Sequence, residues 1–183
     1  MTTGVFIQVK FVLILNKKEA YMEKIKTRIG IGYDIHRLEE NRDLIIGGIK
    51  IPYEKGLFGH SDADVLVHAI IDALLGALAL PDIGTLFPDT DEKYKDANSI
   101  ELLKKVYSMV KEKGYRINNL DSNIIAQAPK MMPYIPEMKK VLSSALELDI
   151  KDISIKAKTK EHLDAVGEKR AIEAQAIASV YQV

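Results

Sequence analysis

The chain has 183 residues, with 26 Lys and Arg against 26 Asp and Glu, and contains no Cys or Trp. This length suits one domain with a sizeable core, and the balanced charge argues against a general nucleic-acid binder, which would carry a basic excess. Because Cys is absent, disulfides, thiolate zinc sites and a Cys nucleophile are excluded, so any metal would be held by nitrogen and oxygen ligands.

The first 27 residues stand apart from the rest of the chain. Their apolar run at 11–15 is too short to cross a bilayer, which takes about 20 residues, and no small-residue cleavage site follows it as in a secretory signal. A short extra strand, a targeting remnant and a true translation start at Met22 are all open interpretations. We therefore expect residues 1–27 to be an N-terminal extension of unknown role and residues 28–183 to form a single domain.

A β-rich segment comes next. Residues 28–35 alternate as a strand, with Gly30 and Gly32 where a backbone or a ligand can approach closely. Residues 44–51 form two short apolar runs around a Gly-Gly pair, which predicts a β-hairpin. Pro52 should end this hairpin.

An apolar helix is predicted from Ser61 to about Leu80. Ser61 is a favourable N-cap, acidic residues follow in what should be the first turn, and Pro81 stops the helix. On such a helix, i, i+4 steps would align one polar stripe, made of His60, Asp64, His68 and Asp72. The stripe needs partners, because an unpaired buried polar group costs roughly several kcal/mol.

The second half of the chain alternates helices, strands and loops. Residues 82–91 have the composition of an irregular loop, and Asn98 with Glu101 has the capping-box spacing of a helix that runs to Gly114. The remaining predicted elements are a strand at 120–127, a turn at 128–133, a helix opened by Pro136, and strands at 153–157 and 172–180. This order predicts an α/β (α+β) fold, with a mixed β-sheet and helices packed on one face.

Three of the four histidines fall in the first strand and the first helix. Asp34 and His36 are two residues apart, so they leave the same face of a strand. With His68 they form a candidate zinc site of two imidazoles and one carboxylate, with a fourth position open for water or substrate. The structural alternatives are a strand-end cap for Asp34 and a satisfied core histidine for His68.

Three further stretches offer ligand chemistry, and each also has an ordinary explanation. Residues 156–161 place lysines, a hydroxyl and a carboxylate that suit phosphate with Mg²⁺ or Mn²⁺, although a solvated charge run is the simpler explanation. Residues 126–132 offer backbone groups and Lys130 for a base and a phosphate, or they form a surface turn. The loop at 82–91 offers carboxylates for polyol hydroxyls, although acid-rich loops are common.

Five ordered motifs carry a resemblance to a known enzyme family. They are GYDIH at 32–36, GGIKIPYEKGL at 47–57, HSDADVLVH at 60–68, DIGTLFPDTD at 82–91 and IIAQAPKM at 124–131. The chain from Arg28 to its C-terminus resembles the 2-C-methyl-D-erythritol 2,4-cyclodiphosphate synthases, which belong to the non-mevalonate route to isoprenoids. Residues 28–183 would then be a catalytic domain, expected in the cytoplasm, with a plastid as the alternative.

The resemblance implies a homotrimer with an active site in each cleft between neighbouring subunits. The small-molecule partner would be a cytidine diphosphate compound, 4-diphosphocytidyl-2-C-methyl-D-erythritol 2-phosphate, converted to the 2,4-cyclodiphosphate and CMP, with no nucleic-acid or membrane partner. By motif position, Asp34, His36 and His68 would bind Zn²⁺ or another divalent metal. Glu161 would bind Mg²⁺ or Mn²⁺.

The resemblance also implies roles for the residues around these metals. His60 and Thr159 would orient the phosphates and act in catalysis. Substrate contacts would come from Ser61, Asp64, Asp82, Gly84, Phe87, Asp89, Asp91, Ala126, Pro129, Lys130, Met131, Met132 and Lys158.

The pattern departs from the family after Glu161. Many members continue with Gly-Phe and then Gly-Arg-Gly-Glu, whereas this chain has DAVGEKR at 164–170. No role is therefore carried onto Ala165 or Glu168, and no ligand is assigned to the trimer axis. The rival functions are a non-catalytic, metal-bearing nucleotide-binding module and a zinc phosphoesterase.

Overall fold

The computed structural model describes residues 26–95 and 97–183. Its strands are β1 (Thr27–Glu40), β2 (Leu44–Ile46), β3 (Ile49–Ile51), β4 (Lys55–Leu57), β5 (Tyr115–Ile125), β6 (Ile153–Lys158) and β7 (Ala171–Gln182). Its α-helices are α2 (Val65–Ala77), α3 (Ile83–Leu86), α4 (Ser99–Glu112), α5 (Ile135–Leu146) and α6 (Asp164–Gly167). Single 3₁₀ turns are η1 (Glu92–Tyr94), η2 (Met132–Tyr134) and η3 (Ile150–Asp152).

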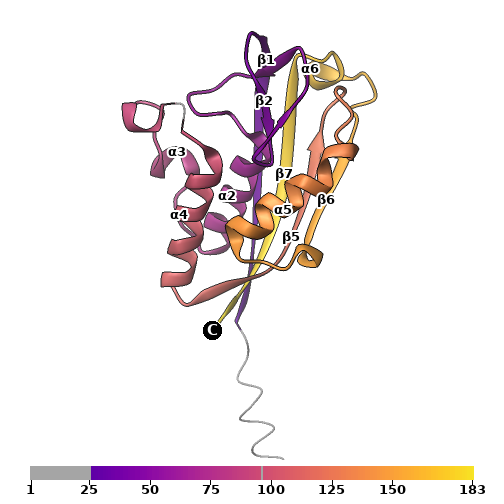
Figure 1. Ribbon diagram of the computed structural model, residues 1–183. Helices are drawn as coiled ribbons and strands as arrows, with labels where there is room; N and C mark the ends of the chain where they lie inside the picture. The colour runs from indigo at the N-terminus through magenta and orange to yellow at the C-terminus, as the bar shows by residue number, and fades with distance from the viewer. Residues whose placement is uncertain (1–25, 96) are drawn as a thin grey trace, which may run out of the picture.

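A five-stranded sheet in the order β4-β1-β7-β5-β6 forms one layer, and α2, α4 and α5 lie together on one of its faces (Figure 1). The strand pairs are antiparallel except β5 and β6, which are parallel. The core between the layers joins apolar residues of α2 and α4 to inward residues of β5 and β7, among them Leu66, Ile70, Leu74, Leu103, Leu120 and Val180. The predicted mixed sheet with helices on one face is confirmed.

Two glycines bring α2 directly onto β1. A Cβ atom on Gly30 would lie 2.0 Å from the backbone oxygen of Ala73, and one on Gly32 would lie 1.9 Å from that of Ala69. No side chain fits there, so the helix backbone rests on the strand, as the glycines in the sequence predict. Because residues two apart share a strand face, Asp34 and His36 point to the same side as Gly32 and meet α2.

The other face of the sheet is apolar and exposed. On β1 it carries Ile29, Ile31, Tyr33 and Ile35, and Ile31 pairs across the ladder with Ile177 of β7. Ile31 is 72% exposed and Ile177 is 46% exposed. At their centres, β1 and β7 therefore direct small residues toward the helices and large apolar residues away from them, which leaves an apolar patch on this face.

The hairpin at residues 44–51 forms as the sequence predicts, whereas the first helix begins later than predicted. Gly47 and Gly48 have φ values of +63° and +75°, which suit a tight turn between β2 and β3, so the predicted hairpin is confirmed. The predicted N-cap at Ser61 is wrong, because α2 begins at Val65 with Asp64 as its cap. His60 and Asp64 therefore lie before the helix, and the predicted four-residue stripe keeps only His68 and Asp72 on α2.

Later elements follow the sequence more closely. Asn98 caps α4, Pro136 stands in the first turn of α5, and β6 and β7 lie where alternation predicts them. The predicted start of β5 at residue 120 is wrong, because the strand begins at Tyr115. A bulge between Ile117 and Asn119 breaks the two-residue alternation and hides that start.

The remaining predictions concern the segment before β1 and the possibility of a membrane-spanning helix. The predicted extra strand at 11–15 and the start at Met22 lie outside the described residues. No helix in the described part of the chain combines the length and the apolar character that crossing a bilayer requires.

Candidate metal and substrate site

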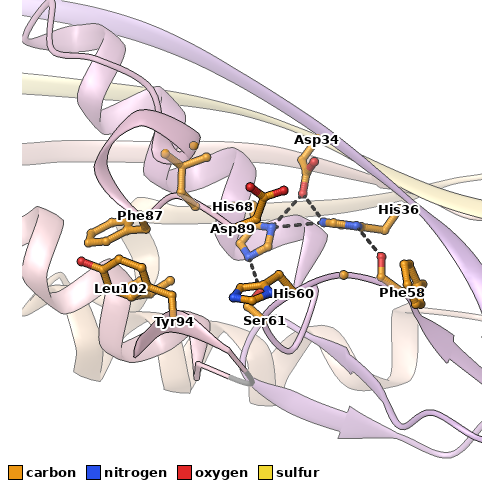
Figure 2. A pocket seen from close by; sticks show the side chains of 13 residues that line it. Asp34, His36, Phe58, His60, Ser61, His68, Phe87, Asp89, Tyr94 and Leu102 are labelled. Carbon is orange, nitrogen blue, oxygen red and sulfur yellow. Dashed lines mark hydrogen bonds and ion pairs between the residues drawn. The ribbon is translucent and has the colours of Figure 1, made fainter. Parts of the chain in front are cut away.

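A cavity of about 730 Å³ opens beside the N-terminal half of α2 (Figure 2). The loop between β4 and α2 forms one wall, and the segment around α3 and η1 forms another. Eight residues singled out from the sequence line this cavity, namely Asp34, His36, His60, Ser61, His68, Gly84, Phe87 and Asp89. The cavity therefore collects residues from three separate sequence motifs.

Asp34, His36 and His68 converge at one end of the cavity. Asp34 Oδ2 lies 3.0 Å from His36 Nε2 and 2.9 Å from His68 Nδ1, and the two ring nitrogens are 3.3 Å apart. Ligand atoms of a tetrahedral zinc ion are about 3.3 Å from one another, given bonds of about 2.0 to 2.1 Å. The three atoms therefore form a triangle of the size that a zinc ion spans, and the predicted grouping of these residues is confirmed.

The ring of His36 is fixed in the orientation that a metal requires. Its Nδ1 lies 2.8 Å from the backbone oxygen of Phe58, which accepts hydrogen bonds and cannot donate one. In the neutral ring, Nδ1 therefore carries the proton, and the lone pair of Nε2 points toward Asp34. This is the usual second contact of a metal-binding histidine.

Charges reinforce the convergence. Burial alone would raise the pKa of Asp34, but the contacts of its carboxylate with the His36 and His68 rings outweigh burial and hold that pKa well below its usual range. Burial would lower the pKa of His36, but its bond to Asp34 outweighs it and raises that pKa above the usual value. The triad is therefore an anionic carboxylate facing two bases, a donor set that suits a divalent cation.

His60 and Ser61 lie on the loop that precedes α2 and face the same cavity (Figure 2). The Nε2 atom of His60 is buried and has no hydrogen-bond partner among the described residues. Since buried polar atoms are nearly always paired, this atom marks a position where a bound ligand would accept or donate a hydrogen bond.

The opposite wall depends on Asp72 of α2. Its Oδ1 accepts a 2.8 Å hydrogen bond from the backbone N–H of Ile83 and so ties α3 to α2. Burial raises the pKa of Asp72. Beyond this tie, Phe87 packs edge to face on Tyr94, with ring centroids 5.3 Å apart, and forms an apolar floor next to Gly84 and Asp89.

Asp64 does not reach the cavity. Its side chain is fully buried and accepts hydrogen bonds from the backbone N–H groups of Gly47, Gly48 and Val67. Both carboxylate oxygens are thus used to join the β2–β3 turn to the start of α2. This burial contradicts the predicted substrate contact of Asp64 and gives the residue a structural role.

Asp82 and Asp91 act as caps in this segment. Asp82 accepts from the N–H of Thr85 at the start of α3, and Asp91 accepts from the N–H of Lys93 at η1. Neither side chain lines the cavity. Their predicted substrate contacts therefore remain predictions, and the structure shows a local capping role for each.

The other predicted residues form a second cluster at the ends of β5 and β6. It contains Ala126, Pro129, Lys130, Met131 and Met132 after β5, and Lys158, Thr159 and Glu161 after β6. The backbone N–H of Ala126 donates to the Lys158 oxygen at 2.9 Å, which joins the two segments. Met131 is 3% exposed, so its side chain belongs to the core, whereas Met132 is 74% exposed.

A strained turn presents Glu161. Its φ of +49° and the +63° of His162 are left-handed, which costs about 1 to 2 kcal/mol for each such residue. Gln127 supports this turn, because its Oε1 accepts from the backbone N–H groups of Lys160 and His162. The Thr159 hydroxyl donates to the Glu161 carboxylate, and both side chains are exposed.

The two clusters lie apart within one chain. The triad stands on β1 and α2, whereas Glu161 follows β6, three strands away along the sheet. Neighbouring strands are about 4.8 Å apart, so the separation is on the order of 14 Å. The cavity around the triad includes none of the predicted residues of the second cluster.

Sequence reasoning missed several contacts of the site. Phe58 and Tyr94 line the cavity, and Asp62 and Ser99 form hydrogen bonds beside His68. Phe58 is 41% exposed next to the triad, and the Arg37 guanidinium lies 4.0 Å from the centre of its ring. The sequence signal for Phe58 is its place between two motifs, directly after residues 47–57 and two residues before His60.

Comparisons with known proteins show which family the chain is similar to. A family model described as the YgbB family matches residues 27–181. The 2-C-methyl-D-erythritol 2,4-cyclodiphosphate synthase of Clostridioides difficile is 59% identical over 150 residues, which is 82% of this chain and 93% of the relative. The enzyme of the same name from Alkaliphilus oremlandii is 59% identical over 153 residues, which is 84% of this chain and 98% of the relative.

Solved structures give the same result. IspF of Plasmodium falciparum, described as a CDP complex, is 39% identical with a TM-score of 0.76, and the match covers 87% of this chain and 99% of that one. The bifunctional IspDF of Campylobacter jejuni is 40% identical with a TM-score of 0.84 over 87% of this chain. This chain corresponds to 43% of that longer protein.

Proposed function

The chain belongs to the YgbB family, whose curated relatives are 2-C-methyl-D-erythritol 2,4-cyclodiphosphate synthases, and from this premise we propose how its residues carry out that reaction. The substrate is 4-diphosphocytidyl-2-C-methyl-D-erythritol 2-phosphate. An oxygen of its 2-phosphate attacks the β-phosphorus, the bond from that phosphorus to the bridging oxygen breaks, and CMP leaves. The product is the 2,4-cyclodiphosphate, and the enzyme is a metal-dependent lyase.

The chemistry explains why the cavity needs no nucleophile of its own. A phosphate monoester has a second pKa of about 6 and is largely dianionic at pH 7, so the substrate supplies the attacking oxygen without a general base. The protein must instead orient two anionic groups in line and offset their charge. His60 and Ser61 bind phosphate oxygens beside the triad in this proposal, which is supported by the buried His60 Nε2 that has no partner among the described residues.

Asp34, His36 and His68 hold the metal in this proposal. The observation that carries it is the triangle of ligand atoms, with sides of 2.9 to 3.3 Å, that faces the cavity. Two imidazoles and one carboxylate with an open position suit Zn²⁺ or another divalent metal. When bound, such a metal acts as a Lewis acid and a template for the phosphate.

Glu161 holds a second divalent cation, Mg²⁺ or Mn²⁺. These ions take one or two carboxylates together with substrate phosphates, and the exposed, strained turn leaves the Glu161 carboxylate accessible. Thr159 and Lys158 on the same segment contact the phosphates. The cytidine half of the substrate lies against Ala126, Pro129, Lys130, Met131 and Met132, by backbone groups where the side chain is buried.

The methylerythritol half lies on the opposite wall of the metal cavity. Gly84, Phe87 and Asp89 line this wall and provide backbone, apolar and carboxylate contacts. Asp82 and Asp91 flank the same segment and support it through their caps. The edge-to-face pair of Phe87 and Tyr94 provides an apolar surface on this wall.

A homotrimer brings the two clusters together. Two cations cannot flank one β-phosphate when their ligands are on the order of 14 Å apart in one chain, so the second cluster must come from a neighbouring copy. The exposed apolar patch of Ile29, Ile31, Tyr33, Ile35 and Ile177 supports such an assembly, since apolar patches of this kind mark interfaces. Closed rings of identical subunits place the same pair of surfaces in every cleft.

Residues 28–183 form the catalytic domain in this proposal, and the strand that opens it begins at Thr27. The family model covers nearly the same range. The compartment stays a prediction, with the cytoplasm expected and a plastid as the alternative.

Mass spectrometry of the product tests the proposed function. Incubation with the cytidine diphosphate substrate and Mg²⁺ or Mn²⁺ should release CMP and the cyclic diphosphate. A linear phosphate product would instead identify a zinc phosphoesterase, and nucleotide binding without CMP release would identify a non-catalytic module. A chelator-treated sample serves as the control and should regain activity when Zn²⁺ is added.

A further inference from the structure

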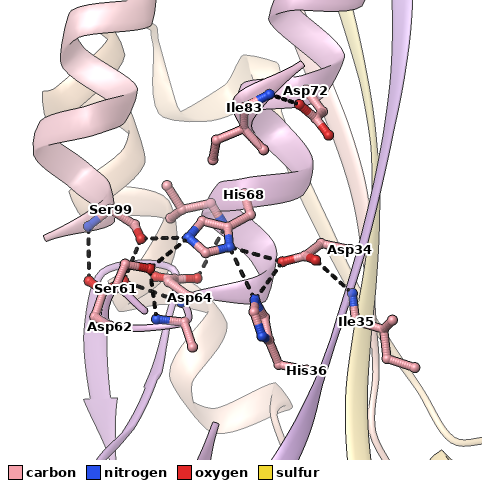
Figure 3. A network of polar contacts seen from close by, with 12 residues as sticks. Asp34, Ile35, His36, Ser61, Asp62, Asp64, His68, Asp72, Ile83 and Ser99 are labelled. Atoms are coloured by element: carbon pink, nitrogen blue, oxygen red, sulfur yellow. Dashed lines mark hydrogen bonds and ion pairs between the residues drawn. The ribbon is translucent and has the colours of Figure 1, made fainter. Parts of the chain in front are cut away.

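A hydrogen-bonded pair outside the triad, Ser99 and Asp62, lies on the far side of the His68 ring, and Ser99 contacts the ring. Its Nε2 lies 2.9 Å from the hydroxyl oxygen of Ser99, the first residue of α4, and both side chains are buried (Figure 3). Ser99 in turn contacts Asp62, on the loop before α2, through two hydrogen bonds. The Ser99 N–H donates to Oδ2 at 2.9 Å, and the Ser99 hydroxyl donates to Oδ1.

The direction of these hydrogen bonds follows from the groups themselves. A carboxylate only accepts, and a serine hydroxyl has a single proton. Because that proton goes to Asp62, the Ser99 oxygen has only lone pairs left for His68. The Nε2 atom of His68 must therefore be the N–H donor, and its Nδ1 presents a lone pair toward Asp34 and His36.

We propose that Ser99 and Asp62 are positioning residues that fix the His68 ring with Nδ1 directed at the metal. This inference rests on the proposed use of the triad as a metal site. Neither residue is part of the cavity lining. They act through His68, in the way that the backbone oxygen of Phe58 acts through His36. One histidine is thus fixed by a backbone group and the other by a side-chain pair.

The pair also connects three separate segments. Asp62 and Ser99 are 37 residues apart in sequence, and their bonds join the loop before α2 to the start of α4 at the ring of His68. Ser61 Oγ lies 3.3 Å from the same ring nitrogen but also accepts from the Ala63 N–H at 3.2 Å. Ser61 is therefore a weaker alternative acceptor for His68 Nε2. Its presence limits the loss of Zn²⁺ affinity that we expect when Ser99 is changed.

The test measures metal binding, because turnover would not separate positioning from other effects. Ser99→Ala removes the acceptor and should weaken Zn²⁺ binding by the full protein roughly 10- to 100-fold, as measured by competition with a chromophoric chelator. Ser99→Thr keeps the hydroxyl and should restore most of the affinity. Ser108→Ala is the matched control on the same helix, where the side chain is exposed, and should leave the affinity unchanged.

Two spectroscopic readouts report on the ring itself. In the Zn²⁺-loaded protein, the His68 Nε2–H proton should give an NMR signal that exchanges slowly with solvent, and Ser99→Ala should make this exchange fast. The visible absorption of bound Co²⁺ should change in Ser99→Ala, since it depends on ligand geometry. A merely destabilising substitution would lower the melting temperature and leave both spectra unchanged.

If Ser99→Ala fails to fold, Asp62→Asn decides the question. An amide facing the Ser99 hydroxyl would donate to it and turn its proton toward His68, so Zn²⁺ binding should weaken in the same direction. Unchanged affinity and spectra in the folded variant would overturn the proposal. A wild-type protein that binds Zn²⁺ but releases no CMP would contradict the proposed function. It would not contradict the positioning role of Ser99, which is measured by Zn²⁺ binding.

Discussion

The triad of Asp34, His36 and His68 lies in a half-buried cleft, whereas Glu161 lies on an exposed turn after β6. The triad side chains are 11 to 25% exposed, and each is held by partners on other elements. Glu161 is exposed and its side chain contacts Thr159, two residues away. The triad is therefore assembled from several elements of one chain, whereas the Glu161 carboxylate is exposed and contacts a residue of its own turn.

This difference gives the two regions different roles in the proposed reaction. A site built by close packing binds its metal before the substrate arrives, since its ligands already stand at the required distances. A single carboxylate on a turn holds Mg²⁺ or Mn²⁺ weakly until phosphates complete the coordination. We therefore expect the zinc to copurify with the protein and the second metal to arrive with the substrate.

The largest effect should follow from removing a triad ligand. His68→Ala leaves two ligands, so the protein should lose its zinc and its turnover should fall on the order of 10³-fold or more, because metal charge stabilisation amounts to several kcal/mol. The fold should survive, as judged by circular dichroism. Metal analysis of the purified variant and a CMP assay check this.

A chelator-treated wild-type sample is the matched control for His68→Ala. Zn²⁺ should restore the activity of the wild type and should not restore that of the variant. Full activity of His68→Ala after chelator treatment would show that the ligand assignment is wrong.

Glu161→Gln should have the next largest effect. It should still bind CDP but turn over on the order of 10²-fold more slowly, comparable to losing one group that stabilises transition-state charge. Because the two regions should come from different copies, coexpressing Glu161→Gln with His68→Ala should create some clefts with two intact halves. Random mixing in a ring would restore about a quarter of the wild-type activity.

Two results would contradict this prediction in different ways. If isolated mixed trimers stay as inactive as the parent variants, both regions must serve the same cleft from one chain. Unchanged Glu161→Gln rates at limiting Mg²⁺ or Mn²⁺ would instead remove Glu161 from the metal role.

The triad was predictable from the sequence because its signals are local or strongly patterned. Asp34 and His36 are two residues apart on a strand, and His68 stands on an apolar helix where an unpaired imidazole would be costly. Asn98 and Pro136 likewise marked the starts of α4 and α5 through local capping chemistry.

The parts that were not predictable depend on contacts between distant segments. Both Ser61 and Asp64 are good caps, and the N–H groups of the distant Gly47 and Gly48 fix Asp64 as the actual one. The bulge in β5 hid the start of that strand. The separation of the triad from Glu161 follows from the strand order, which the sequence alone does not contain.

The close approach of α2 to β1 gives a smaller effect that acts on the triad from a distance. Gly32→Ala should destabilise the fold by about 1 to 3 kcal/mol or more, because its Cβ would lie 1.9 Å from the Ala69 oxygen. The displaced helix should move His68 and weaken Zn²⁺ binding. Denaturant unfolding and chelator competition check both effects.

Gly76→Ala is the matched control on α2. Its Cβ would lie 3.6 Å from the Ile31 oxygen, an ordinary contact, and Ala is favoured over Gly inside a helix by about 0.5 to 1 kcal/mol. This variant should be as stable as the wild type or more stable, with unchanged Zn²⁺ affinity. Equal effects of the two substitutions would show that close packing at Gly32 does not position His68.

The smallest expected effect is the pH dependence of the triad, where a proton on His36 competes with Zn²⁺. Burial would lower the pKa of His36, but its bond to Asp34 raises it above the usual 6.5. In the metal-free protein, the protonated His36 therefore adds stability that is fully present below pH 6.5 and is lost as the pH rises through the raised pKa. Zn²⁺ needs the neutral ring, so it competes with this proton.

Zn²⁺ affinity should therefore increase between pH 6 and 8, by at most about tenfold per pH unit for each proton displaced. Calorimetric titrations in buffers of different ionisation enthalpy would count the protons released. His36→Ala should show a smaller pH slope for whatever Zn²⁺ affinity it keeps. A Zn²⁺ affinity that stays constant between pH 6 and 8 would mean that no proton occupies the triad. The triad and the exposed Glu161 carboxylate would then differ only in burial.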